Sequence, residues 1–237
     1  MEQLKAILNK KIEKSKYKDK LLDENRKHGY PFNKYEYIIT HLISEGLISI
    51  EEYEKLRKDY IDKNKYLSVY EMTAPRTFGE KWAQKHLNEI VPELKKPSKF
   101  LDPNYKGQYD FWYNGIAIEV KASRAVKRES GNSLIEKAIG SDSNDGFDMN
   151  FQQLKPGCCD VFVWIAVWTD IIQYWVLNSE EVKNNQYYSN SQHRGNNGEG
   201  QLWIKESNIK FFDEYKVEPS DILNKIIQKS NISNLKK

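Results

Sequence analysis

Three charged residues lie close to a turn signal in the middle of the chain. Asp110 precedes the dipeptide Asn114-Gly115, while Glu119 and Lys121 follow it. Asn-Gly between two runs of alternating side chains predicts a β-hairpin with a two-residue turn. Such a turn determines the register of the two strands. The expected cross-strand pairs are Tyr113–Ile116, Trp112–Ala117, Phe111–Ile118 and Asp110–Glu119.

Side-chain alternation gives this hairpin a polar face and an apolar face. Asp110, Glu119 and Lys121 share the polar face. The opposite face carries only apolar and aromatic side chains, namely Tyr109, Phe111, Tyr113, Ile116, Ile118 and Val120. We therefore expect the apolar face to pack against the protein core.

The opposed carboxylates predict a cation between them, because Cβ atoms only about 5 Å apart would otherwise bring like charges together. Oxygen ligands from Asp110, Glu119 and the backbone carbonyl of Val120, completed by waters, suit magnesium, with manganese as a substitute. Lys121 would orient an attacking water or stabilise charge on a phosphate. These groups are those of a phosphodiesterase. The alternative is a solvated hairpin face with an ordinary Glu and Lys, since so short a pattern recurs by chance.

The segment GQYDFWYNGIAIEVKAS resembles the active-site hairpin of the PD-(D/E)XK nuclease superfamily. That signature has an acidic residue on one strand, then Glu or Asp, one residue and Lys on the next. Asp110 matches the first acidic position, Glu119 the second, Val120 the spacer and Lys121 the lysine. Tyr109 stands where the superfamily usually has proline. Within the superfamily, the chain from Thr77 to Leu177 looks most like type II restriction endonucleases.

The resemblance implies a magnesium-dependent endonuclease that hydrolyses double-stranded DNA at a short specific sequence. It implies in-line attack by water, which leaves a 3′-hydroxyl and a 5′-phosphate. A homodimer is expected by analogy, because a palindromic site matches a two-fold protein. One alternative is a repair or recombination nuclease of the same superfamily that recognises DNA structure. Another is a DNA-binding module that has lost catalysis.

Further candidate residues lie on either side of the hairpin. Many superfamily members carry a Glu on the preceding helix, and Glu80 is at the corresponding place, although Thr77 with Glu80 also reads as a capping box. Gln152 and Gln153 either lie near the metal site or are surface amides.

Two basic or polar segments are candidates for DNA contact. Arg124, Lys127 and Arg128 follow the hairpin closely and could hold the phosphate backbone, or could be ordinary exposed cations. The loop SNSQHRGNNGEGQ offers side chains that can read base edges in the major groove, or is a plain loop. Its candidate residues are Gln192, His193, Arg194, Asn196 and Asn197.

Residues 1–72 are expected to form a helical lobe that contacts DNA or another subunit. Apolar residues from Tyr35 to Ile43 recur at helical spacing, with Asn33 as a possible cap and Gly46 as the stop. A second helix begins at Ser49, where Glu52 completes a capping-box pattern.

Residues 73–237 are expected to form the catalytic domain. An amphipathic helix over 77–90 would place Phe78, Trp82 and Leu87 inward. The remaining expected segments are strands over 107–113 and 116–122, a loop over 128–150 with a short helix at 133–139, a buried central strand over 161–168, its hairpin partner over 171–177 and a loop over 187–201. The predicted fold class is α/β: a mixed central sheet flanked by helices, a restriction-endonuclease-like core, after an N-terminal helical lobe.

Composition allows this function without establishing it. The formal net charge of the 237 residues is only +3, so the total charge does not identify a nucleic-acid partner. The two cysteines, Cys158 and Cys159, are adjacent and cannot build a disulfide framework, which favours the cytoplasm. No apolar run approaches membrane-spanning length, so no membrane association is expected.

Overall fold

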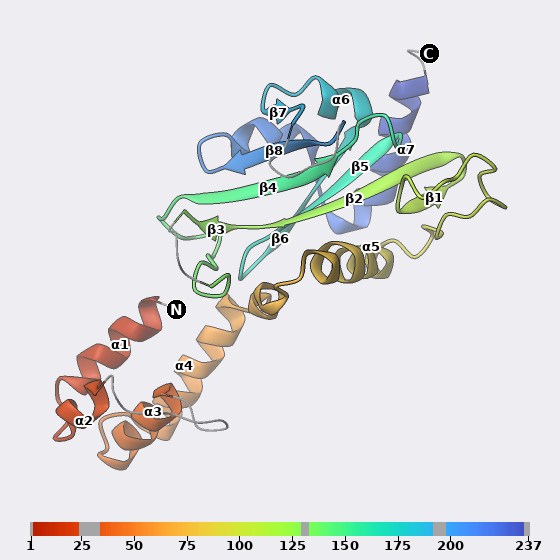
Figure 1. The fold of residues 1–237 in the computed structure, drawn as a ribbon. Helices are drawn as coiled ribbons and strands as arrows, with labels where there is room; N and C mark the ends of the chain where they lie inside the picture. Colours follow the sequence, from red (N-terminus) through yellow and green to blue (C-terminus); the bar gives the residue numbers. More distant parts are fainter. Residues whose placement is uncertain (1, 24–33, 129–132, 192–197, 235–237) are drawn as a thin grey trace. The chain divides into compact units, whose positions relative to one another are not determined.

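The computed structural model describes residues 2–23, 34–128, 133–191 and 198–234, and divides the chain into the units Met1–Asn64 and Lys65–Lys237 (Figure 1). The first unit is helical, as the apolar spacing predicts. Its helices are α1 (Glu2–Ile12), α2 (Lys18–Leu22), α3 (Lys34–Ser44) and α4 (Ile50–Lys63). Their buried side chains form one cluster of Leu8, Ile12, Leu21, Ile38, Leu42 and Ile48. None of the described helices in either unit is long and apolar enough to span a membrane.

The helix ends of the first unit confirm two local predictions. Gly46 has φ +69°, and the chain leaves α3 at this residue because glycine adopts the left-handed conformation without strain. The Ser49 side chain accepts a hydrogen bond from the Glu52 N–H at 3.1 Å and caps α4. Asn33, the expected cap of α3, lies outside the described residues.

The boundary between the units lies after Asn64, ahead of the predicted lobe end at residue 72. The short helix η1 (Leu67–Glu71) belongs to the second unit. Its Tyr70 is fully buried, and the hydroxyl lies 3.0 Å from the Ala125 carbonyl oxygen and 2.7 Å from that of Val167. These long-range contacts were not visible in a pattern that is helical up to this point.

The second unit is a mixed α/β fold in which helices flank two β-sheets (Figure 1). Its strands are β1 (Phe111–Tyr113), β2 (Ile116–Arg124), β3 (Val126–Lys127), β4 (Phe147–Leu154), β5 (Val161–Val167), β6 (Ile172–Asn178), β7 (Tyr188–Ser189), β8 (Gly200–Lys205) and β9 (Lys216–Val217). Its other helices are η2 (Thr77–Ala83), α5 (Gln84–Ile90), α6 (Ser179–Lys183), η3 (Ile209–Tyr215), η4 (Pro219–Asp221) and α7 (Ile222–Asn234). The first sheet has the order β1-β2-β5-β6-β9 and the second β3-β4-β8-β7.

Strands β1 and β2 form the predicted hairpin. Asn114 and Gly115 have φ values of 45° and 90°, as a tight two-residue turn requires. The predicted register is confirmed for three pairs, Phe111–Ile118, Trp112–Ala117 and Tyr113–Ile116. The first strand is shorter than the expected 107–113, because the chain from Gly107 to Asp110 belongs to a loop.

Strand β5 is the buried centre of the first sheet. All of its residues are buried, and it runs parallel to β2 and antiparallel to β6, which confirms the predicted central strand and its hairpin partner. Val161, Val163, Ile165 and Val167 pack in the cluster that includes η2, α5 and α7. Phe162, Trp164 and Ala166 pack toward the second sheet. The predicted mixed sheet flanked by helices is therefore present.

The second sheet corrects the expectation of two long loops. Strand β4 begins at Phe147, inside the stretch predicted as loop, and β7 and β8 occupy parts of the stretch over 187–201. Phe147, Met149 and Phe151 do alternate toward the second cluster, but the intervening polar residues obscured that pattern. The expected short helix over 133–139 is a single turn that ends in a bridge between Val126 and Ala138.

The predicted helix over 77–90 is present in two parts, the π-helical η2 followed by α5. Phe78 and Leu87 are buried on its inner face, as predicted, and Trp82 is partly buried. The capping box at Thr77, the alternative interpretation of Glu80, is not formed, because the helical turn already begins before it. The Phe78 N–H donates to the Ala74 carbonyl at 3.1 Å.

Candidate active site

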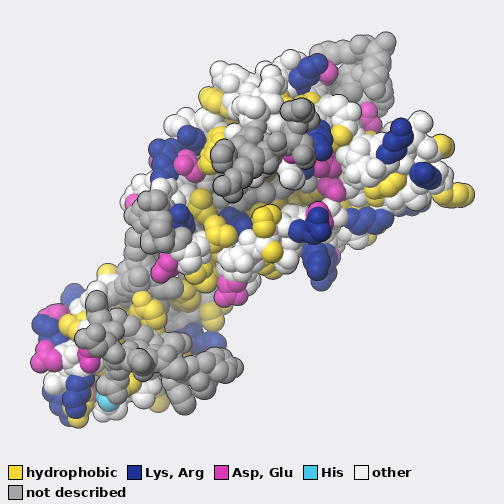
Figure 2. Space-filling model, in the orientation of Figure 1, with side chains coloured by type: hydrophobic (Ala, Val, Ile, Leu, Met, Phe, Trp, Pro, Cys, Tyr) yellow, Lys and Arg dark blue, Asp and Glu magenta, His cyan; other side chains and the backbone are white. Residues whose placement is uncertain are grey.

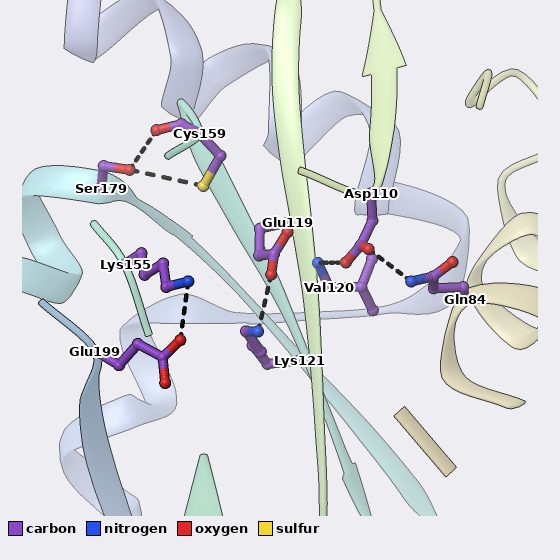
Figure 3. A network of polar contacts seen from close by, with 9 residues as sticks. All are labelled: Gln84, Asp110, Glu119, Val120, Lys121, Lys155, Cys159, Ser179 and Glu199. Atoms are coloured by element: carbon purple, nitrogen blue, oxygen red, sulfur yellow. Dashed lines mark hydrogen bonds and ion pairs between the residues drawn. The ribbon is translucent and has the colours of Figure 1, made fainter. Parts of the chain in front are cut away.

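The structure brings Asp110, Glu119 and Lys121 together beside the β1–β2 hairpin (Figure 3). Lys121 Nζ lies 2.8 Å from Glu119 Oε1, and only 17% and 13% of the two side chains are exposed. Asp110 and Glu119 are close enough that each affects the pKa of the other. The central group predicted from the sequence is therefore one cluster.

Asp110 does not form the expected cross-strand pair with Glu119. Hydrogen bonds to its side chain hold it in place instead. The strand pairing ends at Phe111–Ile118, and the Asp110 N–H donates to the Ile118 carbonyl at 3.0 Å. Oδ2 of Asp110 accepts the Val120 N–H at 2.9 Å. The carboxylate thus takes the place of a backbone partner and is fixed against β2.

Gln84, the first residue of α5, holds the other oxygen of the same carboxylate. Its Nε2 donates to Asp110 Oδ1 at 2.6 Å, and its Oε1 accepts a hydrogen bond from Lys96 Nζ. Lys96 Nζ also lies 4.3 Å from the centre of the Phe111 ring. Sequence reasoning missed Gln84 and Lys96, although Gln84 is one helical turn beyond the candidate Glu80.

Glu80 itself forms an ion pair with Arg76, whose Nε lies 3.3 Å from Glu80 Oε2. The Glu80 side chain is 61% exposed. Together with Gln84 and Lys96 it lines a surface hollow of about 300 Å³. Glu80 is therefore beside the site, but the contact to Asp110 is made by Gln84.

Burial makes both carboxylates hard to ionise. It raises the pKa of Glu119 to about 7; the charge of Asp110 acts in the same direction, and that of Lys121 opposes it. Burial also raises the pKa of Asp110, against the effects of the Val120 N–H, Lys121 and Lys96. Two adjacent acids poorly solvated by water form a site that a divalent cation would stabilise.

A second ion pair lies on the other side of Glu119 (Figure 3). Lys155 Nζ is 2.9 Å from Oε1 of Glu199, a residue that is only 4% exposed. The hydrogen bond with Glu199 raises the pKa of Lys155, and the charge of Glu119 contributes in the same direction. Lys155 lines a hollow of about 500 Å³ with Lys106, Gln108, Pro156, Gly157, Cys158 and Gly198. The sequence carried no local signal for this pair, since its members are joined only through β4 and β8.

Arg124 has a structural position. Its Nη1 donates to the carbonyls of Val69 at 3.1 Å and Met72 at 2.8 Å. The guanidinium lies 4.1 Å from the centre of the Phe78 ring. Arg124 thus ties η1 and η2 to β2, and we leave it out of the proposed DNA contacts.

Lys127 and Arg128 both have acidic partners, one just before β4 and one within it. Lys127 Nζ lies 2.5 Å from Asp145, and Arg128 Nε lies 2.9 Å from Asp148. The Arg128 side chain is 58% exposed, whereas that of Lys127 is 16% exposed. Arg128 is therefore the more accessible of the two for a phosphate.

The two candidate glutamines occupy an irregular part of β4. Gln152 pairs with Gln201, and the register shifts between Gln152 and Leu154. Gln153 lies within this bulge with φ 54°, a conformation uncommon for a residue other than glycine. Both glutamines are exposed. The loop candidates Gln192, His193, Arg194, Asn196 and Asn197 lie outside the described residues.

The donor groups of the site suit magnesium. In the described part of the chain, no three His, Cys, Asp or Glu side chains converge as a metal-binding group. Magnesium keeps several waters and commonly takes only one or two protein carboxylates. Asp110 and Glu119, with a backbone carbonyl such as that of Val120, fit this requirement.

The comparisons with known proteins add no relative: no protein-family model matches this chain, and no curated protein matches it significantly.

Proposed function

We propose that this protein is a magnesium-dependent endonuclease that hydrolyses double-stranded DNA, in the manner of a type II restriction endonuclease acting at a short specific sequence. The proposal rests on the convergence of Asp110, Glu119 and Lys121, with the pKa of Glu119 raised to about 7. A site used only for folding has no need of two adjacent buried acids, since they lower stability.

Asp110, Glu119 and the Val120 carbonyl would hold the metal. When bound there, magnesium supplies Lewis-acid polarisation of a phosphate and lowers the pKa of water. Asp110 is prepared for this role because the Val120 N–H and Gln84 already fix the direction of its carboxylate. Preformed ligands lose less conformational entropy on binding than mobile ones do.

Lys121 would act directly on the phosphate. Its ammonium donates to Glu119 at 2.8 Å, which fixes its direction, and an ammonium carries further N–H donors. One of these would hydrogen-bond a phosphate oxygen as negative charge develops there, or orient the attacking water. The low exposure of Lys121 strengthens that interaction, because fewer waters compete.

The cations around the site match a nucleic-acid backbone. The hollow beside Gln84 is lined by Lys81, Lys85 and Lys96, and the hollow on the opposite side by Lys106 and Lys155. Lysines on both sides of the carboxylates would bind phosphates that flank the scissile one. A homodimer would present two such sites to a palindromic sequence.

Digestion of unmethylated phage-sized DNA with magnesium tests the proposal, with an EDTA control and sequencing of the fragment ends. Glu119→Ala is the inactivating variant. Glu89→Ala is the matched control, because Glu89 is a 61%-exposed acid on α5 that forms an ion pair with Lys85 on the helix surface. We expect discrete fragments that share one end sequence from the wild type and from Glu89→Ala.

Each other outcome would favour one of the alternative functions or contradict the proposed site. A magnesium-dependent smear lost in Glu119→Ala would indicate a nuclease that does not read sequence, and cleavage confined to branched DNA a structure-specific one. DNA binding without cleavage of any substrate would indicate a binding module. Cleavage that survives in Glu119→Ala would contradict the proposed site.

A further inference from the structure

One aromatic side chain in the second unit is almost completely exposed. Phe100 is 94% exposed, and the next most exposed large hydrophobic residue among those described is Ile50 at 61%. Single exposed apolar residues are ordinary on protein surfaces. A phenylalanine held out in solvent on an ordered loop is less so, because its burial would contribute roughly 2 kcal/mol.

The loop that carries Phe100 is built to hold a fixed shape. It leaves α5 through a two-hydrogen-bond bridge between Lys95 and Trp112, with N···O distances of 3.0 and 2.8 Å. Ser98 O accepts hydrogen bonds from the N–H groups of the two residues that follow Phe100, at 3.0 and 2.9 Å. Pro97 and Pro103 restrict the backbone on either side. Phe100 therefore projects from a rigid turn.

The same loop is fastened to the residue that directly precedes Asp110. Asp102 accepts the Asn104 N–H at 2.9 Å and the Tyr109 hydroxyl at 2.7 Å. Tyr109 is buried and directly precedes Asp110. Phe100 is two residues from Asp102, so their Cα atoms lie within about 7 Å of each other. A duplex bound at Asp110 would pass close to this loop.

The charge of the loop suits nucleic acid. Lysines 95, 96, 99 and 106 are all exposed, while the carboxylate of Asp102 is engaged within the loop. In the space-filling view, Lys and Arg side chains stand beside hydrophobic ones at the end of the second unit that carries β1 (Figure 2). An exposed aromatic ring on a loop with four exposed lysines fits stacked bases between phosphates better than it fits an apolar protein surface.

We propose that Phe100 is a wedge that inserts between adjacent base pairs of the bound duplex, while the loop lysines hold the neighbouring phosphates. Insertion would unstack one base step and bend the DNA toward the carboxylates. Because steps differ in how easily they unstack, Phe100 would contribute to the choice of target sequence. This inference rests on the proposed nuclease function and adds a DNA contact outside the catalytic group.

The test uses the full-length Glu119→Gln variant, which under the proposed function should bind DNA without cutting it. The probe is a duplex of about 30 base pairs that contains a cleavage position mapped by end sequencing, with 2-aminopurine placed at one position at a time. We expect a fluorescence rise of about threefold or more at one step next to the cleavage position, because this base fluoresces more when unstacked. Fluorescence anisotropy measures the affinity in parallel.

A second substitution then tests whether Phe100 causes the rise in fluorescence. Adding Phe100→Ala should abolish the rise and weaken binding about tenfold, as loss of one stacking contact does. Adding Phe100→Tyr should restore the rise, because the ring is kept. Trp203→Ala is the control, since Trp203 is an exposed aromatic residue, 40% exposed, on β8.

The outcomes separate this inference from the function on which it rests. A nuclease whose fluorescence rise is unchanged by Phe100→Ala, or that gives no rise at any position, overturns the wedge and leaves the nuclease intact. Loss of dimerisation in Phe100→Ala with unchanged DNA binding also overturns it, in favour of contact with a second copy. Absence of any DNA cleavage by the wild type removes the proposed function and the wedge together.

Discussion

Strands β2 and β5 run side by side and place opposite kinds of residue on the same face. Glu119 lies next to Phe162, and Lys121 lies next to Trp164. The two aromatic residues are fully buried in the cluster toward the second sheet, whereas the two charged residues keep a small exposure. On the other face both strands are apolar, with Ile118 and Val120 beside Val161 and Val163.

The difference separates stabilisation from chemistry. Burial of Phe162 and Trp164 stabilises the fold through apolar area and packing. Burial of Glu119 beside Asp110 costs free energy, which the raised pKa of both acids reflects. A strand that sacrifices stability on one face alone indicates that this face carries the function.

The largest effect is expected for Lys121→Ala. We expect the single-turnover rate of DNA cleavage to fall by roughly a thousandfold, because one donor to the developing charge is lost in a site with little water. The fold should be retained. Lys216→Ala, an exposed cation on β9, is the control and should cleave at the wild-type rate. Full cleavage by Lys121→Ala would show that the charged face of β2 does not carry the chemistry.

Trp164→Ala should lower the stability of the protein, because Trp164 is one of the apolar residues of β5 that stabilise the fold. Trp164 is fully buried and stacks on Phe151 with ring centres 4.8 Å apart. We expect urea denaturation to show a loss of about 3–5 kcal/mol in the free energy of unfolding. The protein that stays folded should retain its cleavage rate. A loss of cleavage without a loss of stability would show that β5 also contributes to chemistry.

The pH dependence of the free energy of unfolding should show the cost of burying Glu119 on β2. The folded pKa of Glu119, about 7, lies above its ordinary value, so the metal-free folded state binds more protons than the unfolded state between the two values. Stability should therefore fall as pH rises from 5 to 8, by up to roughly 3 kcal/mol from this residue. Glu119→Gln should remove that part of the slope when unfolding is measured in EDTA. Identical slopes would contradict the assigned burial of the acid.

Gln84→Ala should give the smallest change. Gln84 positions Asp110 and does not touch the reacting phosphate in the proposed mechanism. We expect the magnesium concentration for half-maximal cleavage to rise about tenfold, as it does when a residue that orients a metal ligand is removed. The rate at saturating magnesium should change much less. An unchanged magnesium dependence would show that the hydrogen bond to Asp110 is incidental.

Local signals made the hairpin and the central strand predictable. The Asn114-Gly115 turn sets the register within a few residues, and β5 is a continuous apolar run. The second sheet could not be read in this way, because β4 and β8 are separated in sequence and carry polar residues at alternate positions. The boundary at Asn64 depends on contacts of Tyr70 with distant strands, which no local pattern reveals.

The residues of the candidate site also differ in whether local sequence could identify them. Asp110, Glu119 and Lys121 were found because alternation along one hairpin places them together. Gln84, Lys155 and Glu199 reach the same place from three other elements, so only the tertiary fold identifies them. Arg124 looked like a DNA contact in the sequence, and its engagement by the carbonyls of Val69 and Met72 required the structure.

The central claim is that the charged face of β2 is a cation site, and manganese titration followed by electron paramagnetic resonance tests it most directly. The free Mn²⁺ signal should fall as wild-type protein is added and should recover when excess Mg²⁺ competes. Asp110→Asn and Glu119→Gln should each weaken Mn²⁺ binding at least about tenfold. If both variants bound Mn²⁺ as strongly as the wild-type protein does, the account would be contradicted.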